Sequence, residues 1–222
     1  ALTVIAKTDQ VKSIGSGRTD AGVHAINQVV RIEIPLEINP NNLVKAINTK
    51  LPSDIRVKSA SNSSADFHPI FSAKSKEYNY VFTTKEIYSV FGRNQMAHFD
   101  FQFDFELMQK ACKAFEGSHD FKNYQCTGTD IENTMRTITL CEVEKHSSTG
   151  HWGNCVGDYY VIRVVGNGFL KQMVRLMVGA IWNASRNKIQ ISDIQNSLLN
   201  PSDKRLGAVA PHEGLYLIKV DY

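Results

Sequence analysis

The stretch that decides the fold and chemistry of this chain is SGRTDAGVHAINQ, residues 16–28. Three glycines in and beside it surround Arg18 and Asp20. Because glycine adopts backbone conformations that other residues avoid, this composition predicts a tight loop that exposes a carboxylate beside a guanidinium. Arginine holds a carboxylate in place, and it binds a phosphate equally well. The alternative is a structural turn in which Asp20 only hydrogen-bonds to nearby backbone.

Segments rich in β-branched and aromatic residues predict strands beyond this loop. These segments are residues 28–34 (QVVRIEI), 54–59 (DIRVKS), 77–83 (EYNYVFT), 136–145 (RTITLCEVEK), 158–165 (DYYVIRVV) and 214–220 (GLYLIKV).

Helical spacing of apolar residues and N-cap residues predict four helices. They are a helix that begins at the Asn/Pro cluster 39–42, a helix over 105–116 capped by Asp104, an apolar helix over 169–183, and a helix capped by Ser192 that ends at Leu199. Strands interleaved with a few helices, including hairpins, predict the α+β fold class, with helices on one face of the sheets.

A small and polar stretch, residues 59–65 (SASNSSA), predicts a domain junction near Asp66. We therefore expect an N-terminal α/β subdomain over residues 1–66, which carries the Asp20 loop, and a C-terminal α/β subdomain over residues 67–222.

The composition is that of an ordinary folded protein, with 42% hydrophobic and 21% charged residues among 222. A formal net charge of +3 permits a nucleic-acid partner without requiring one. No apolar run has the length of a membrane span, and the first residues lack the pattern of a signal peptide. The sequence therefore predicts a cytoplasmic protein with no membrane partner.

The chain contains four cysteines, too few for a disulfide scaffold, and none forms a CxxC pair. Reduced thiols are the expectation. Cys141, His146, His151 and Cys155 have the side chains of a compact zinc site. Zinc sites usually carry a close Cys or His pair at each end, so a polar hairpin loop over residues 146–157 is the favoured interpretation, and no metal is predicted.

Residues 17–25 (GRTDAGVHA), followed by Gln28, form a dense motif that resembles the signature of the tRNA pseudouridine synthase A family. Further motifs of that family follow in the same order and cover almost the whole chain. They are residues 51–55 (LPSDI), 66–68 (DFH), 71–73 (FSA), 78–80 (YNY), 117–121 (GSHDF), 136–138 (RTI), 169–170 (FL), 173–175 (MVR), 178–179 (VG) and 213–217 (EGLYL).

The resemblance implies roles for individual side chains. Asp20 matches the catalytic carboxylate, and Tyr78 matches the aromatic residue that stacks on the target uracil and is implicated in proton removal from its C5. Arg175 matches the basic residue that pairs with the aspartate. Leu215 matches an apolar residue bordering the base pocket, and Arg18 is a candidate for orienting the flipped nucleotide or its phosphate.

The resemblance also implies the reaction and the fold. The expected activity is isomerisation of uridine to pseudouridine at positions 38–40 of the tRNA anticodon stem-loop, by a homodimer that uses neither metal nor cofactor. The expected fold is the pseudouridine synthase fold, in which two RRM-like or ferredoxin-like subdomains with antiparallel sheets join around a central active-site cleft. The His24 form of the signature resembles the bacterial type.

Reasoning from the residues agrees with the implied role of Arg175. A charge on the apolar helix predicted over 169–183 is costly to bury alone, so it should reach an acid or a phosphate. The alternative is a solvent-facing position on that helix. For Tyr78 the alternative is simple cross-strand packing, and for Arg18 it is stabilisation of its own loop.

The chain also departs from the family pattern. Residues 1–7 resemble the end of a helix that follows an N-terminal strand in the family, and we expect that strand to be missing. Glu77 occupies a position where a basic or hydroxyl residue is more usual, and the loop over residues 147–157 is longer than in the family.

Two other functions stay open. One is an RNA-binding module without catalysis, which requires exposed aromatic residues on its sheet. The other is a hydrolase stabilised by a metal at the Cys141–Cys155 cluster.

Overall fold

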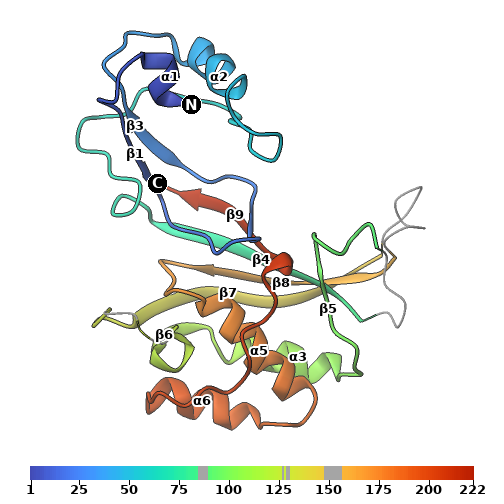
Figure 1. Cartoon of the computed structure of the whole chain (residues 1–222). Helices are drawn as coiled ribbons and strands as arrows, with labels where there is room; N and C mark the ends of the chain where they lie inside the picture. Colours follow the sequence, from blue (N-terminus) through green and yellow to red (C-terminus); the bar gives the residue numbers. More distant parts are fainter. Residues whose placement is uncertain (85–89, 127, 129–130, 148–156) are drawn as a thin grey trace. The chain divides into compact units, whose positions relative to one another are not determined.

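The structure is a computed structural model, and it describes residues 1–84, 90–126, 128, 131–147 and 157–222 (Figure 1). The chain forms two compact units. The smaller unit contains Ala1–Gly17 and Val29–Ala73, and the larger contains Arg18–Gln28 and Lys74–Tyr222. The smaller unit thus ends later than the junction expected near Asp66. The Asp20 loop belongs to the larger unit, because its backbone and side-chain hydrogen bonds described below go to that unit.

The smaller unit contains a two-stranded antiparallel sheet and two helices. Strand β1 (Lys12–Gly15) pairs with β3 (Val30–Glu33), and the helices are α1 (Leu2–Ala6) and α2 (Pro40–Asn48). The Asn/Pro cluster begins α2 as predicted, because the Asn39 side chain accepts a hydrogen bond from the backbone nitrogen of Asn41 at 2.9 Å.

The strand predicted over residues 54–59 is wrong. The Asn48 side chain accepts from the backbone nitrogen of Val57 at 2.8 Å and donates to the Val57 carbonyl at 2.9 Å. One amide side chain thus satisfies both backbone groups of Val57, in the middle of this segment, and the segment forms no strand.

The larger unit contains a seven-stranded mixed sheet with the order β2-β9-β4-β8-β7-β6, and β5 pairs with β4. The pairs β9-β4, β4-β8, β8-β7 and β7-β6 are antiparallel, whereas the two-residue strands β2 and β5 pair in parallel with β9 and β4. The strands are β2 (His24–Ala25), β4 (Ser75–Thr83), β5 (Ala97–His98), β6 (Gly117–Asp120), β7 (Met135–His146), β8 (Tyr159–Gly166) and β9 (Leu215–Asp221).

Helices α3 (Phe105–Lys113), α5 (Met173–Ser185) and α6 (Ile191–Leu199) lie together on one face of this sheet (Figure 1), which confirms the predicted α+β class. The described part of this unit also contains two short 3-10 turns, η1 (Lys122–Tyr124) and η2 (His212–Gly214). The Asp104 cap is confirmed, since its carboxylate accepts from the nitrogen of Leu107 at 3.0 Å.

Two helix starts differ from the prediction. The cap of α6 is Gln190 rather than Ser192, because Gln190 and Asp193 bind each other's backbone nitrogens in a capping box. Helix α5 begins at Met173 rather than at residue 169, because Gln172 adopts a left-handed conformation with φ 61° that interrupts the helix.

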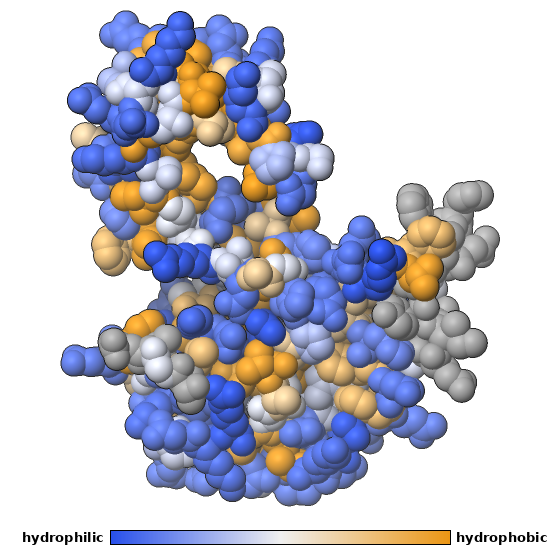
Figure 2. Space-filling model, in the orientation of Figure 1, coloured by the Kyte–Doolittle hydropathy of each residue, from blue (hydrophilic) through white to orange (hydrophobic). Residues whose placement is uncertain are grey.

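The core lies between the sheet and these helices. Tyr80 and Phe82 on β4 and Ile162 and Val164 on β8 are fully buried, and they alternate with partly exposed residues as expected when one face of a sheet is covered. On the surface seen in Figure 2, hydrophilic residues predominate and apolar residues form small patches among them. No helix in the described part of the chain is long and apolar enough to cross a membrane.

Candidate active site

The loop that carries Asp20 is a tight turn, closed by a backbone hydrogen bond and dependent on a glycine at position 22. The Asp20 carbonyl accepts from the backbone nitrogen of Val23 at 3.1 Å, and Gly22 has a φ of 80°. A Cβ atom on Gly22 would lie 2.0 Å from Cδ2 of the His212 ring. The position therefore requires glycine both for its backbone conformation and for the close approach of the imidazole.

The residues that follow the turn fix the loop to the sheet. Strand β2 pairs in parallel with β9, and the nitrogen of Ile26 donates to the Leu217 carbonyl at 2.8 Å. The His24 ring stacks on the Tyr216 ring with centroids 4.5 Å apart, and its Nε2 donates to the Asn94 carbonyl at 2.8 Å. The Asp20 turn is consequently attached to a strand of the sheet on its C-terminal side.

The structure brings Arg175 and Asp20 together. Nη1 of Arg175, on the first turn of α5, lies 2.6 Å from Oδ2 of Asp20, and its Nε donates to the Ala210 carbonyl at 2.6 Å. The Arg175 side chain is 12% exposed and the Asp20 side chain 29%. The guanidinium is thus held from two sides, while the carboxylate it orients stays accessible to a substrate.

Tyr78 and Leu215 lie on neighbouring strands and on the same sheet face as the core. In the pairing of β4 with β9, Tyr78 opposes Leu217 and Tyr80 opposes Leu215, so all four side chains point toward the helices. The Tyr78 ring contacts Phe169 edge-on, with centroids 5.0 Å apart. Burial raises the pKa of Tyr78 to about 12, so its hydroxyl is neutral at physiological pH.

Arg18 is the one predicted site residue that stands apart from these contacts. Its side chain is exposed, and it forms no hydrogen bond or ion pair with the residues that the structure describes. The loop-stabilising alternative considered for Arg18 therefore has no contact in its support.

Sequence reasoning missed the segment that surrounds Arg175. Ala210 binds it through the backbone, His212 packs on the Asp20 turn, and Tyr80 donates from its hydroxyl to the Pro211 carbonyl at 3.0 Å. The alternation of β4 marks Tyr80, which lies two residues beyond Tyr78 and so shares its face. No sequence signal marks Ala210, because its contribution comes from the main chain.

Of the four residues considered as a zinc site, the structure describes Cys141 and His146, and it does not bring these two together. Cys141 and His146 lie on the same strand but on opposite faces: Cys141 is fully buried against the helices, whereas His146 stacks on Tyr159. His151 and Cys155 lie outside the described residues. Within the described ranges, no group of three or more His, Cys, Asp or Glu side chains is placed to hold a metal ion.

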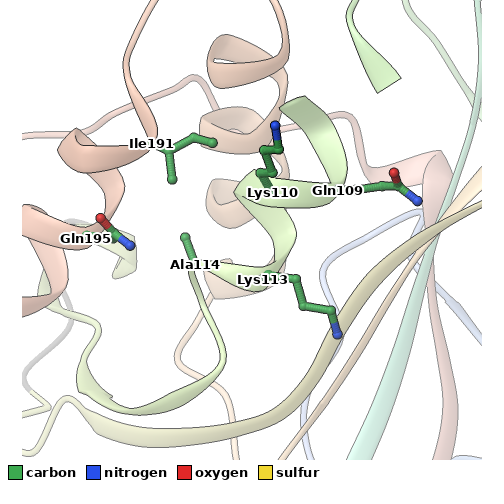
Figure 3. Close-up of a pocket in the computed structure, with 6 residues that line it drawn as sticks. All are labelled: Gln109, Lys110, Lys113, Ala114, Ile191 and Gln195. Atoms are coloured by element: carbon green, nitrogen blue, oxygen red, sulfur yellow. The ribbon is translucent and has the colours of Figure 1, made fainter. Parts of the chain in front are cut away.

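A shallow depression between α3 and α6 lies apart from the predicted site residues (Figure 3). It is lined by Gln109, Lys110, Lys113, Ala114, Ile191 and Gln195. Lys113 points to Glu116, with which it forms a 2.8 Å ion pair. The residues that line the depression include no carboxylate, so the chemistry is better sought at Asp20.

The geometry is that of a partly exposed carboxylate held by a largely buried arginine. The pattern of the family described as tRNA pseudouridine synthase matches residues 2–72 and 111–222 of the chain. The chain therefore belongs to the tRNA pseudouridine synthase family, isomerases that convert uridine to pseudouridine in tRNA.

Individual relatives agree with this family. A tRNA pseudouridine synthase A of Geobacillus sp. (strain WCH70) is 36% identical over 216 residues, which cover 97% of this chain and 83% of that protein. Enzymes of the same name from Exiguobacterium sp. and Limosilactobacillus reuteri (strain DSM 20016) are 39% and 36% identical, over 96% and 100% of this chain and 81% and 84% of their own lengths.

Proposed function

We propose that Asp20 is the catalytic carboxylate with which this chain isomerises uridine to pseudouridine in the anticodon stem-loop of tRNA, at positions 38–40. The observation that carries the proposal is the 2.6 Å contact between Asp20 and Arg175, in which the carboxylate is oriented yet remains 29% exposed. A catalytic carboxylate needs this combination, because it must be held in place and must also reach its substrate.

The reaction requires a bond exchange within one nucleotide. The bond between N1 of uracil and C1′ of ribose breaks, the base turns, and a bond forms between C5 and C1′. The proton leaves C5 and N1 gains one, so composition and oxidation state are unchanged and the proposed mechanism uses neither metal nor cofactor. Asp20 acts on C1′ of the sugar or on C6 of the base, and both routes need a carboxylate beside the flipped nucleotide.

Access to the nucleotide requires base flipping, because a uracil stacked in an RNA stem is out of reach. Unstacking costs a few kcal/mol, and stacking on an aromatic side chain offsets part of that cost. We assign this stacking to Tyr78, whose ring lies on the same face as the apolar side chain of Leu215. The assignment places the uracil between an aromatic face and an aliphatic wall.

Arg18 is assigned to the phosphate or sugar of the flipped nucleotide. Its exposed guanidinium lies two residues from Asp20 and has no partner among the described residues, which suits a contact made only in the complex. Replacement of Arg18 by Ala should weaken tRNA binding and reduce the slope of log affinity against log salt by about one. An unchanged salt slope would remove this assignment.

The proposal includes a homodimer in the cytoplasm and the two RRM-like subdomains implied by the family resemblance. The apolar side chains of α5 are buried in the chain's own core, so they are not available for a dimer contact. Light scattering of the protein at micromolar concentration tests the dimer, and a monomeric mass would contradict it.

The decisive experiment replaces Asp20 by Asn, which keeps the shape of the side chain and removes its charge. Release of tritium from tRNA labelled at C5 of uridine measures turnover, because the C5 proton is lost in the reaction. We expect no measurable turnover, with tRNA affinity and thermal stability nearly unchanged. Turnover within about tenfold of the unmodified protein would refute the role of Asp20. A non-catalytic RNA-binding module, the other candidate, predicts no release by either protein.

A further inference from the structure

Arg175 depends on a segment that has no assigned role. Residues 207–214, which we call the strap, form the last part of the connection from α6 to β9 and run beside α5 (Figure 1). The Ala210 nitrogen donates to the Arg175 carbonyl at 3.1 Å, and the Ala210 carbonyl accepts from Nε of Arg175 at 2.6 Å. The strap therefore holds both the backbone and the guanidinium of the residue that orients Asp20.

The first part of the strap is fixed on α5 by direct contact of backbones. A Cβ atom on Gly179 would lie 2.0 Å from the Ala208 carbonyl oxygen, and one on Gly207 would lie 2.3 Å from the Gly179 carbonyl carbon. Two glycines thus allow the strap to approach the helix more closely than side chains would permit. Beyond Ala210, the strap leaves the helix and needs another anchor.

Tyr80 supplies that second anchor. It is fully buried on β4, and its hydroxyl donates to the carbonyl of Pro211, the residue after Ala210. Its ring also packs on Gly214, where an added Cβ would lie 2.8 Å from Cζ of Tyr80. One side chain therefore contacts the strap on both sides of His212, whose ring packs on the Asp20 turn.

Burial raises the pKa of Tyr80 far above its usual range, with a further increase from the negative charge of Glu213 and a decrease from the positive charge of Arg175. The hydroxyl consequently stays neutral and remains a donor at physiological pH.

From these contacts we infer that Tyr80 is a positioning residue for catalysis, which fixes the Pro211 carbonyl and thereby the Ala210 carbonyl that aims Arg175 at Asp20. The inference rests on the proposed catalytic role of Asp20. Without the hydroxyl, the Pro211 carbonyl loses its donor and moves toward another one. The neighbouring Ala210 carbonyl moves with it, and a displacement of about 1 Å at a catalytic group costs up to about a hundredfold in rate.

The test replaces Tyr80 by Phe, which removes only the hydroxyl, and uses Tyr124 as a matched control. Tyr124 is equally buried, and its hydroxyl shares one hydrogen bond of 2.9 Å with Ser197 between η1 and α6. Both variants lose one buried hydrogen bond, so we expect similar losses of thermal stability. The single-turnover rate constant at saturating enzyme should fall about tenfold or more for Tyr80→Phe and stay within about twofold for Tyr124→Phe.

A double-mutant cycle shows whether Tyr80 acts through Arg175. In a chain that already carries Arg175→Met, the Tyr80→Phe change should cost little further rate, because the guanidinium that it positions is gone. The tRNA dissociation constant should stay within about twofold in all Tyr80 variants, since Tyr80 is buried and does not reach the substrate.

Four results separate the hypotheses. Equal rates for Tyr80→Phe and Tyr124→Phe would overturn the inference, and so would a full additional rate loss in the Arg175→Met background. If Asp20→Asn remains active, the proposed function itself fails, whatever Tyr80 does. If Asp20→Asn is inactive while Tyr80→Phe behaves like its control, only the positioning role fails.

Discussion

Two arginines of the larger unit pair with carboxylates in very different ways. Arg163 lies on the sheet face turned away from the helices, where its Nε contacts Glu77 at 2.7 Å and its Nη1 contacts Glu142 at 3.4 Å. Its side chain is 40% exposed. Arg175 lies on the first turn of α5, is 12% exposed, and pairs with one carboxylate, Asp20, among the described residues.

The difference shows how the same chemical pair serves two purposes. Arg163 and its two partners come from three adjacent strands, so each can be lost while another contact remains, and exposed pairs of this kind contribute about 1 kcal/mol or less. Arg175 has one carboxylate and one carbonyl, each on a separate fork of the guanidinium. Neither contact can replace the other, but together they fix the orientation of the guanidinium and so that of the carboxylate beside it. A catalytic carboxylate requires such a fixed orientation.

Loss of Arg175 should give the largest effect. We expect Arg175→Met to reduce the single-turnover rate by about a hundredfold or more, because Asp20 loses the group that aims it. Arg175→Lys should keep part of the activity through its charge, yet a single ammonium cannot replace both Nε and Nη1. Rate against pH should also differ between the two variants, since only Lys preserves a positive charge beside the carboxylate.

The matched control is Arg163→Met, which should leave this rate unchanged. If Arg175→Met instead weakens tRNA binding and leaves the rate at saturating enzyme intact, Arg175 is a phosphate anchor and the contrast between the two arginines collapses.

A second, smaller loss of rate should follow from Gly22→Ala. The added methyl meets the His212 ring and also occupies a backbone with φ 80°, so the Asp20 turn must shift, and we expect about a tenfold lower rate. Gly128→Ala is the control, because Gly128 has a φ of 76° but an added Cβ there meets nothing within 4 Å. It should cost about 1 kcal/mol of stability and no activity. Similar rates for the two variants would show that the His212 contact is unimportant.

The helix-covered face should also respond to alkaline pH through Tyr78. Its pKa is about 12 in the folded chain and near 10 in the unfolded chain, so the unfolded state loses the proton first. The stabilising contribution is complete below pH 10 and disappears as pH rises toward 12, by at most about 3 kcal/mol. Urea unfolding of Tyr78→Phe at pH 9 to 11 should show a shallower decline than the unmodified chain. Parallel declines would indicate that Tyr78 is hydrated.

The smallest effect is expected on the far face. Arg163→Met should lower the free energy of unfolding by about 1 kcal/mol or less, and added salt should reduce the difference, because the pair is partly exposed. Urea unfolding at low and high salt measures it. A loss of several kcal/mol that salt does not change would show that Arg163 behaves as part of a buried ion pair, and it would contradict the contrast drawn with Arg175.

The sequence predicted the long strands well, because β4, β7, β8 and β9 alternate or carry β-branched runs that are visible within one segment. The short strands β1, β2, β5 and β6 were missed, since two to four residues carry no period and form a strand only where a neighbouring strand pairs with them. The strand wrongly predicted over residues 54–59 shows that composition alone is also insufficient. These residues have the composition of a strand, but the Asn48 side chain binds the backbone groups of Val57.

For the site, the sequence predicted a partner for Arg175, because a charged residue on an apolar helix is unusual. A charge at Arg175 on an apolar helix was expected to reach an acid or a phosphate, and in the structure it contacts the Asp20 carboxylate. The strap could not be predicted, because its contacts use carbonyl groups of Ala210 and Pro211 that every residue possesses. Only the fold determines which carbonyl meets which donor.

The parallel pairing of β2 with β9 has a consequence for synthesis of the protein. Asp20 is translated 155 residues before Arg175, and Asn27 is translated 191 residues before Ile218, whose carbonyl accepts from its side chain. A nascent chain therefore carries an unassembled Asp20 loop until β9 has left the ribosome. Activity toward tRNA, which surrounds every translating ribosome, is thus delayed until translation has reached the far end of the sheet.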